Sequence, residues 1–139
     1  MNSYLFSEIK EGLKESFSVE ITDEVIKSFI SVCGDTNPLH VDSDYAKSKG
    51  FESCLVHGML VSSFYSTLCG MYLPGKYCVL HGIDISFAKP VFSGDILDIS
   101  GEVKYINEAY KQLEIKSIIS NHKGQKVSKA TIKAGVIDE

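Results

Sequence analysis

The residues best suited to chemistry lie in the short segment 34–42. Its candidate side chains are those of Asp35, Asn37, His40 and Asp42. Pro38 disfavours the helical conformation at Asn37, so we expect the chain to turn there. A turn can bring Asp35 and His40 to one point, whereas on a straight helix residues five apart diverge by about 140°. A carboxylate and an imidazole that share one water molecule suit proton transfer. The same residues also build ordinary turns, so the segment alone leaves both interpretations open.

A second candidate group, His57, Gly58 and Met59, stands at the start of an apolar stretch. A helix that begins here leaves the N–H groups of its first turn free, at the positive end of the helix dipole. Gly58 lets another molecule approach the backbone closely, so its amide can donate to a developing oxyanion. We expect His57 to be a hydrogen-bonded structural histidine. Ser66, further along the helix, can bond back to a carbonyl one turn earlier.

The apolar stretch, residues 55–73, contains no Asp, Glu, Lys or Arg. Its length is close to the roughly 20 residues that a membrane-spanning helix needs. It is nevertheless too polar for a helix that faces lipid, since it contains one histidine, several hydroxyl side chains and two glycines. No cluster of basic residues flanks it either. We therefore predict a helix buried in a protein core and no membrane span. Pro74 and Gly75 are expected to end it.

The elements around this helix predict an α+β domain. A short strand at 17–21 precedes a helix that Thr22 caps and Gly34 ends, and Ser43 is expected to cap a short helix that runs to Lys49. After the apolar helix come four segments rich in β-branched and aromatic residues, at 79–87, 92–105, 111–120 and 127–137. We predict one domain, residues 1–139, with an antiparallel sheet wrapped around the apolar helix.

Composition narrows the function classes. The chain of 139 residues is 44% hydrophobic and 23% charged, with a net charge of −4. Its lysines are scattered, which disfavours nucleic acid as a partner. The four cysteines show no CxxC spacing, so we expect reduced, buried thiols and no metal site. The amino-terminal residues lack an apolar signal core, and we expect a cytoplasmic protein.

Three motifs together resemble one family. Segment 34–42, with the sequence GDTNPLHVD, resembles the hydratase motif of the MaoC-like, (R)-specific enoyl-CoA hydratases. Ala46, Gly50-Phe51 and the VHGM sequence at 56–59 fit the same pattern. So do the SFAKPV sequence at 86–91 and the Gly-Asp pair that follows it. The resemblance covers about residues 17–137 in the family's order.

The resemblance implies a hotdog fold, in which a sheet wraps a central helix, and a homodimer or higher oligomer. It implies hydration of trans-2-enoyl-CoA to (R)-3-hydroxyacyl-CoA, or the reverse dehydration, with coenzyme A thioester as substrate and no cofactor. The family's catalytic residues map onto Asp35 and His40, its oxyanion donor onto the Gly58 amide, and a supporting helix serine onto Ser66. Asn37, His57 and Met59 are expected to bind substrate or support the loop.

Other functions stay open at this point. The carrier can be acyl-carrier protein, the reaction can be that of a hotdog thioesterase, or the domain can bind acyl-CoA without turnover. A dehydratase that pairs a loop histidine with a helix glutamate is disfavoured, because residues 55–73 contain no acid. Which of Asp35 and His40 is the base is also open. We expect both side chains to share a cavity with the Gly58 amide, and an acyl pocket or core packing to involve Phe64, Tyr65, Leu68 and Met71.

Overall fold

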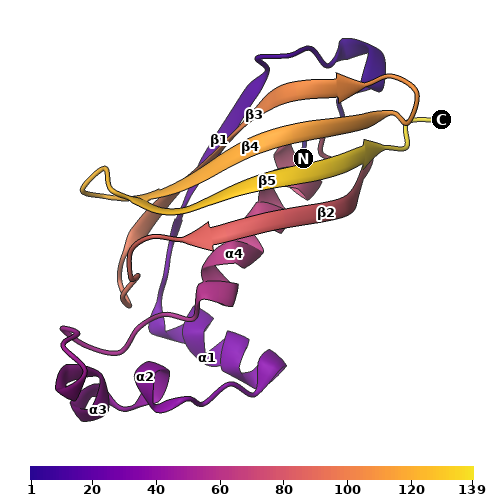
Figure 1. The fold of residues 1–139 in the computed structure, drawn as a ribbon. Coiled ribbons are helices and arrows are strands. Elements are labelled where there is room, and N and C mark those ends of the chain that lie inside the picture. Colours follow the sequence, from indigo (N-terminus) through magenta and orange to yellow (C-terminus); the bar gives the residue numbers. More distant parts are fainter.

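A strongly curved antiparallel sheet dominates the computed structural model, which describes all residues 1–139 (Figure 1). Its five strands are β1 (Lys14–Glu20), β2 (Cys78–Phe87), β3 (Ile96–Asn107), β4 (Gln112–Asn121) and β5 (Lys126–Val136). They pair in the order β1-β3-β4-β5-β2, and every neighbouring pair is antiparallel. Strand β2 is therefore an edge strand, although it precedes the three central strands in the sequence.

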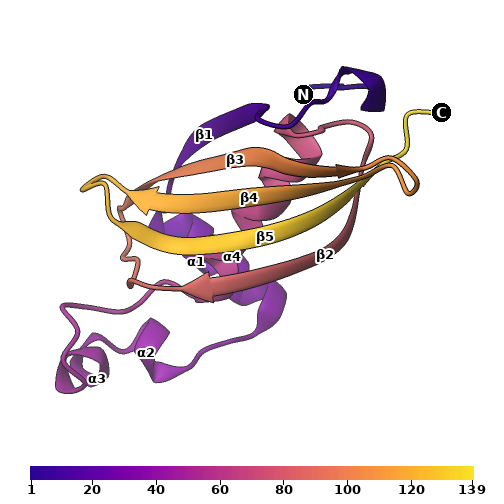
Figure 2. The same cartoon turned by 45° about the horizontal axis from the view of Figure 1, so that its top comes forward.

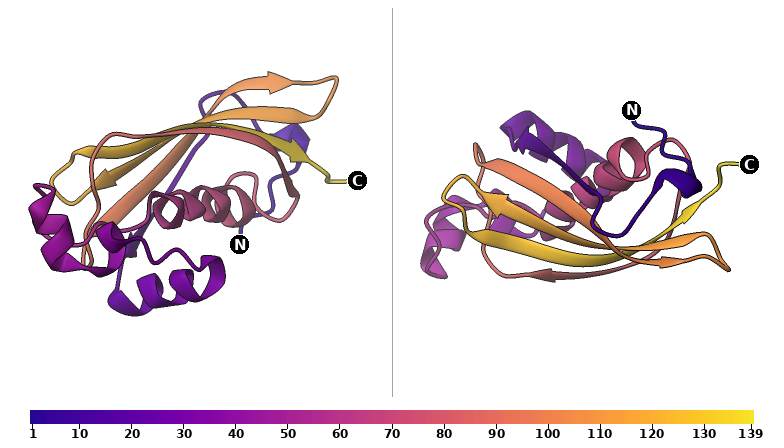
Figure 3. Two further views of the ribbon diagram at one scale, coloured as in Figure 1. Left: turned by 60° about the horizontal axis from the view of Figure 1, so that its bottom comes forward. Right: turned by 90° about the horizontal axis from the view of Figure 1, so that it is seen from above.

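One helix lies against the concave face of this sheet, as Figure 3 shows from two sides. Helix α4 (Gly58–Thr67) continues into a π-helical turn, η2 (Leu68–Tyr72). Leu60, Val61, Tyr65 and Leu68 face the sheet and are buried in a core of 21 residues. The Tyr65 hydroxyl donates to Ser128 Oγ of β5 at 2.8 Å, which ties the helix to the sheet. This sheet-wrapped helix is the hotdog arrangement.

The burial of α4 confirms the predicted core helix. No helix of the structure combines the length and the hydropathy needed to cross a bilayer. The helix is covered on one side only, however, because Met59, Ser63 and Ser66 are exposed. Its start also differs from the apolar stretch, since residues 55–57 are not helical and the helix begins at Gly58.

The helices before α4 lie beside the sheet rather than within its curve (Figure 1). Helix α1 (Asp23–Cys33) has the predicted cap, since Thr22 Oγ1 accepts from the Val25 amide at 3.2 Å. Gly34 ends it in the left-handed region, with φ 73°. Two short helices follow, α2 (Pro38–Val41) and α3 (Ser43–Ser48).

Three sequence-based expectations about local structure are wrong. Asp42, not Ser43, caps α3, because its extended backbone lets the carboxylate accept from the Tyr45 amide at 3.1 Å. Strand β3 starts at Ile96 rather than at residue 92, because the Asp95 carboxylate accepts from the Phe92 amide and closes a turn. Cys33 is exposed, because it lies in the last turn of α1 and outside the core.

The two chain ends lie at the same end of the molecule, the end farthest from α2 and α3 (Figure 2). A 3-10 turn, η1 (Phe6–Glu8), lies in the amino-terminal segment. The Phe6 amide donates to the Asp138 carboxylate at 2.6 Å, and Lys111 Nζ lies 3.2 Å from the same side chain. These contacts fasten the first residues to the end of the sheet.

Candidate active site

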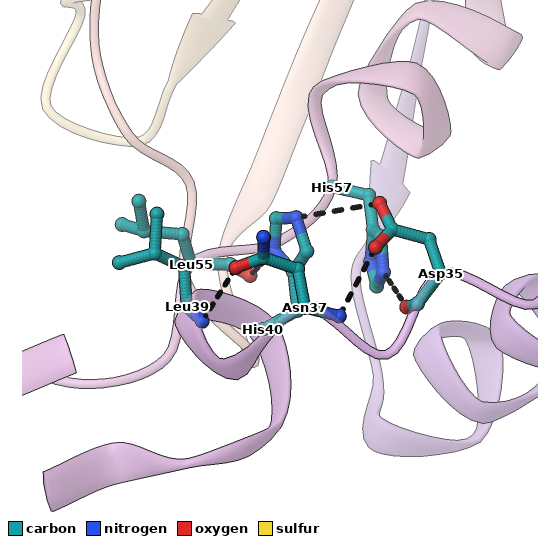
Figure 4. A network of polar contacts seen from close by, with 6 residues as sticks. All are labelled: Asp35, Asn37, Leu39, His40, Leu55 and His57. Atoms are coloured by element: carbon teal, nitrogen blue, oxygen red, sulfur yellow. Dashed lines mark hydrogen bonds and ion pairs between the residues drawn. The ribbon is translucent and has the colours of Figure 1, made fainter. Parts of the chain in front are cut away.

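Asp35 and His40 face each other across the turn that Pro38 creates (Figure 4). Asp35 Oδ2 lies 3.7 Å from His40 Nε2. The Asp35 side chain is 50% exposed and the His40 side chain 17%, so the pair lies at the boundary between solvent and protein. The predicted convergence of this carboxylate and this imidazole is therefore present in the structure.

Asn37 builds the turn between them. Its Oδ1 accepts from the Leu39 amide at 3.0 Å, which caps α2 with Pro38 in the first helical position. The Asn37 amide donates to Asp35 Oδ1 at 3.1 Å and orients that carboxylate. Asn37 thus stabilises both the Asp35 side chain and the start of α2, which is the loop-supporting role expected for it.

A backbone contact fixes the tautomer of neutral His40. Its Nδ1 lies 2.7 Å from the carbonyl oxygen of Leu55. A carbonyl can only accept, so Nδ1 carries the proton and donates. The lone pair of the neutral ring is then on Nε2, the nitrogen that faces Asp35. His40 is therefore arranged to accept a proton on the side where a water molecule can meet the carboxylate.

His57 lies beneath this pair and is only 2% exposed. Its Nε2 donates to the backbone carbonyl of Asp35 at 2.8 Å, which ties the loop to the residue just before α4. Its ring stacks on His40, with centroids 3.8 Å apart, and the Phe29 ring lies edge-on at 5.1 Å. Nδ1 of His57 is buried without a hydrogen-bond partner.

The same three side chains bring possible metal ligands together. Ligand atoms of Asp35, His40 and His57 all lie within 4.8 Å of one another. A metal ion must lie near the plane of each imidazole that binds it, but the two rings are stacked with only 23° between their planes. Nearly parallel planes do not meet at a common ion beside both rings. The geometry favours proton transfer and loop support over metal binding.

A cavity of about 320 Å³ adjoins this group. His40 and Gly58 line it, together with apolar side chains such as Phe51, Val61 and Phe87. Asp35 does not line it, contrary to the expectation that all three site groups share one cavity. Asp35 is half-exposed, and of the pair only His40 lines the cavity.

The first turn of α4 has the free amides that an oxyanion needs. The Leu60 and Val61 amides both donate to the His57 carbonyl, which leaves those of Gly58 and Met59 without backbone partners. A side chain at position 58 would meet Phe87, since a Cβ there would lie 3.1 Å from Cε1 of that ring. Gly58 thus allows the Phe87 ring to pack against the start of the helix.

Five of the predicted site residues do not line the cavity: Asp35, Asn37, His57, Met59 and Ser66. Met59 is 64% exposed, and Ser66 is exposed two turns after Gly58. Of the two alternatives left open for Tyr65 and Leu68, an acyl pocket or core packing, the structure shows core packing. Sequence reasoning assigned no role to Phe51, Phe87 and Lys89, which do line the cavity. Their signal was the match of Gly50-Phe51 and of segment 86–91 to the family pattern.

Comparison with known proteins decides the family. The sequence model of the "MaoC like domain" matches residues 6–126 of this chain. The chain belongs to the MaoC-like domain family. This MaoC-like chain is 37% identical over 100 residues to the (R)-specific enoyl-CoA hydratase of Aeromonas caviae, covering 72% of this chain and 75% of that protein. It is also 37% identical over 92 residues to the enzyme of the same name from Rhodospirillum rubrum, covering 66% of this chain and 64% of the relative.

Solved structures agree on the fold of this MaoC-like chain. The R-hydratase PhaJ1 from Pseudomonas aeruginosa superposes with a TM-score of 0.89 at 27% identity, covering 96% of this chain and 86% of that one. The (R)-hydratase from A. caviae superposes with a TM-score of 0.88 at 30% identity, covering 93% of this chain and 98% of that one. The predicted hotdog fold is confirmed.

Proposed function

We propose that this protein is an (R)-specific enoyl-CoA hydratase, a hydro-lyase that converts trans-2-enoyl-CoA to (R)-3-hydroxyacyl-CoA and back. The observation that carries the proposal is the Asp35–His40 pair beside a cavity that both His40 and Gly58 line. The names of the relatives from A. caviae and R. rubrum support the same reaction.

Hydration adds a hydroxyl to C3 and a proton to C2, and it requires stabilisation of the negative charge that develops on the thioester carbonyl oxygen. In the proposed mechanism, one water molecule lies between ionised Asp35 and neutral His40, both of which can accept a proton. The pair removes one proton as the oxygen of water bonds to C3, and the electrons of the double bond move onto the carbonyl oxygen. The proton held by the pair then passes to C2, so the enzyme ends as it began.

The Gly58 amide supplies the charge stabilisation in this mechanism. The enolate oxygen forms only during the reaction, so a donor already in place stabilises the transition state more than the bound substrate. One such donor is worth roughly 3–4 kcal/mol. Acid–base catalysis with an amide donor needs no metal or redox group, and we propose that the enzyme uses no cofactor.

The assembly we propose is a homodimer. Strand β2 is an unpaired sheet edge that carries exposed Val79, Leu80, Ile83 and Phe87. Such an edge favours pairing with a second copy. Exposed Ser66 would then be available to support a site near the subunit contact. Light scattering during gel filtration tests this: a mass near twice that of the 15.3 kDa chain is expected, and a monomer contradicts it.

The single-domain extent and the location are proposals as well. We propose that residues 1–139 form one MaoC-like unit, since one core unites strands and helix. The four free cysteines suit a reducing compartment such as the cytoplasm.

A second carrier is also supported by a specific observation. Over 85 residues the chain is 41% identical to the mitochondrial 3-hydroxyacyl-[acyl-carrier-protein] dehydratase of Arabidopsis thaliana, covering 61% of this chain and 49% of that protein. The same chemistry on an acyl-carrier-protein thioester is therefore the alternative proposal.

The decisive experiment follows loss of the conjugated absorbance of crotonyl-CoA. We expect hydration by the wild type, and a decrease in kcat of about 10²- to 10⁴-fold in Asp35→Asn and His40→Ala. Asp44→Asn and His122→Ala are matched controls, because both side chains are exposed and neither lines the cavity. Wild-type activity that neither substitution reduces would exclude the mechanism. Release of free thiol without hydration would indicate a thioesterase, and tight binding without turnover a binding module.

A further inference from the structure

Lys89 is the only lysine or arginine among the residues that line the cavity beside His40. No Asp or Glu lines this cavity. Lys14 in β1, Lys104 in β3 and Lys111 in the turn before β4 each pair with a carboxylate, but Lys89 forms no ion pair. Its ammonium group is therefore available for a ligand that enters the cavity.

The backbone of Lys89 is fixed relative to the proposed oxyanion donor. The amides of Ala88 and Lys89 both donate to the Val127 carbonyl, at 2.9 and 3.4 Å. Two residues later, the Val91 carbonyl accepts from the Val56 amide at 2.8 Å, just before Gly58. The chain is thus held to β5 on one side and to the start of α4 on the other. Only the flexible side chain of Lys89 is free to follow a ligand.

The net negative charge of the protein makes a cation at this cavity important for binding an anionic substrate. The chain has a net charge of −4, which repels an anionic substrate at long range. Thioesters of coenzyme A and of acyl-carrier protein both carry a phosphate on the pantetheine arm, at the end away from the thioester. A lysine ammonium is a compact cation that suits a phosphate. An unpaired lysine at the cavity offsets the repulsion where the phosphate has to bind.

We infer that Lys89 binds the phosphate of the pantetheine arm while the thioester lies beside His40 and the Gly58 amide. The inference rests on the proposed hydratase function and names the part of the carrier that the site recognises. That phosphate is common to coenzyme A and to acyl-carrier protein. Recognition by Lys89 therefore serves both carriers, whereas a contact with the nucleotide would serve coenzyme A alone.

Three crotonyl thioesters test the inference. They are the N-acetylcysteamine thioester, which has no phosphate, the phosphopantetheine thioester, which has one, and crotonyl-CoA. In Lys89→Ala we expect KM to rise about fivefold for the two phosphorylated substrates, relative to the change with N-acetylcysteamine. We expect kcat to change little, because the contact is as strong with bound substrate as in the transition state. Lys89→Arg should restore most of the affinity.

Lys76→Ala is the matched control, since it removes a lysine that does not line the cavity, and it should leave all three KM values unchanged. The KM of the wild type for crotonyl-CoA should rise with salt, and this dependence should weaken in Lys89→Ala. Equal KM changes with all three thioesters would overturn the inference, as would an effect confined to crotonyl-CoA. If the wild type hydrated none of them, the proposed function would fail instead.

Discussion

Substitution of His57 by phenylalanine separates positioning from folding. The histidine donates from Nε2 to the Asp35 carbonyl, stacks on His40, and leaves Nδ1 buried without a partner. Phenylalanine keeps a planar ring between His40 and Phe29 but removes both ring nitrogens. The variant therefore loses the hydrogen bond that holds Asp35 and, at the same time, the unpaired polar atom.

The two changes nearly cancel in the free energy of unfolding. A lost intramolecular hydrogen bond costs about 0.5–1.5 kcal/mol net, while a buried, unpaired polar group costs about 1–3 kcal/mol. We expect the unfolding free energy of His57→Phe to stay within about 1.5 kcal/mol of the wild type. For a domain of this size the melting temperature then moves by less than about 6 °C.

The effect of the substitution on kcat has no such compensation. Without the His57 donor, the only hydrogen bond that still orients Asp35 is the one from the Asn37 amide. A misplacement of about 1 Å at a reacting group can cost about 10²-fold in rate. We expect kcat for crotonyl-CoA to fall about 10- to 100-fold. His57→Gln, which keeps a side-chain donor but loses the ring, should retain more kcat than His57→Phe and lose more stability.

Thermal melts and initial rates on the same preparations measure both quantities. The reasoning is refuted if His57→Phe keeps the wild-type kcat, because Asp35 would then not depend on His57. It is also refuted if the glutamine variant loses more kcat than the phenylalanine variant, since the ring and not the donor would then position the site.

Three further outcomes are expected. The Asp138 carboxylate accepts a hydrogen bond from the Phe6 amide, and this contact together with Lys111 holds the pKa of the carboxyl below its usual range. The stabilisation of the fold by ionised Asp138 is therefore complete above the ordinary carboxyl pKa. It is lost as the pH falls through the folded-state pKa. Asp138→Asn should thus lower the melting temperature at pH 7, and a difference from wild type that does not shrink as the pH falls below the ordinary carboxyl range would contradict this. Gly101→Ala would place a Cβ 2.7 Å from Cδ2 of buried Leu68, so denaturant unfolding should show a loss of about 1–3 kcal/mol. Ser66→Ala should reduce kcat/KM with an unchanged melting temperature, and an unchanged kcat/KM would remove Ser66 from the site.

Local signals were sufficient to predict much of the fold. The cap at Thr22 and the left-handed Gly34 delimit α1 as expected, because both act within one turn of the chain. The β-branched segments become strands of one sheet. Helix α2 was missed, since four residues after a proline give no periodic pattern. The choice between Asp42 and Ser43 as the cap of α3 also could not be made, because both are good caps and the backbone at Asp42 decides.

The site was predictable only where it is local in sequence. Pro38 brings Asp35 and His40 together within one turn, and the sequence predicted this. The hydrogen bond from His57 to the Asp35 carbonyl joins residues 22 positions apart and involves a backbone atom, so no residue type announces it. The presence of Lys89 in the cavity depends on where β2 leaves the sheet and on its contacts with β5 and Val56.

The proposed chemistry and the core of the protein occupy almost separate parts of the chain. Asp35, His40, His57 and Gly58 fall within one short run that projects beyond the sheet, and of the 21 core residues only Val56 comes from residues 34–57. A duplicated gene could therefore lose the Asp35 and His40 side chains in one copy and keep every residue of the core. The inactive copy would still offer its β2 edge to an active one. Such a division of labour between a scaffold subunit and a working subunit is open to this fold at little cost in stability.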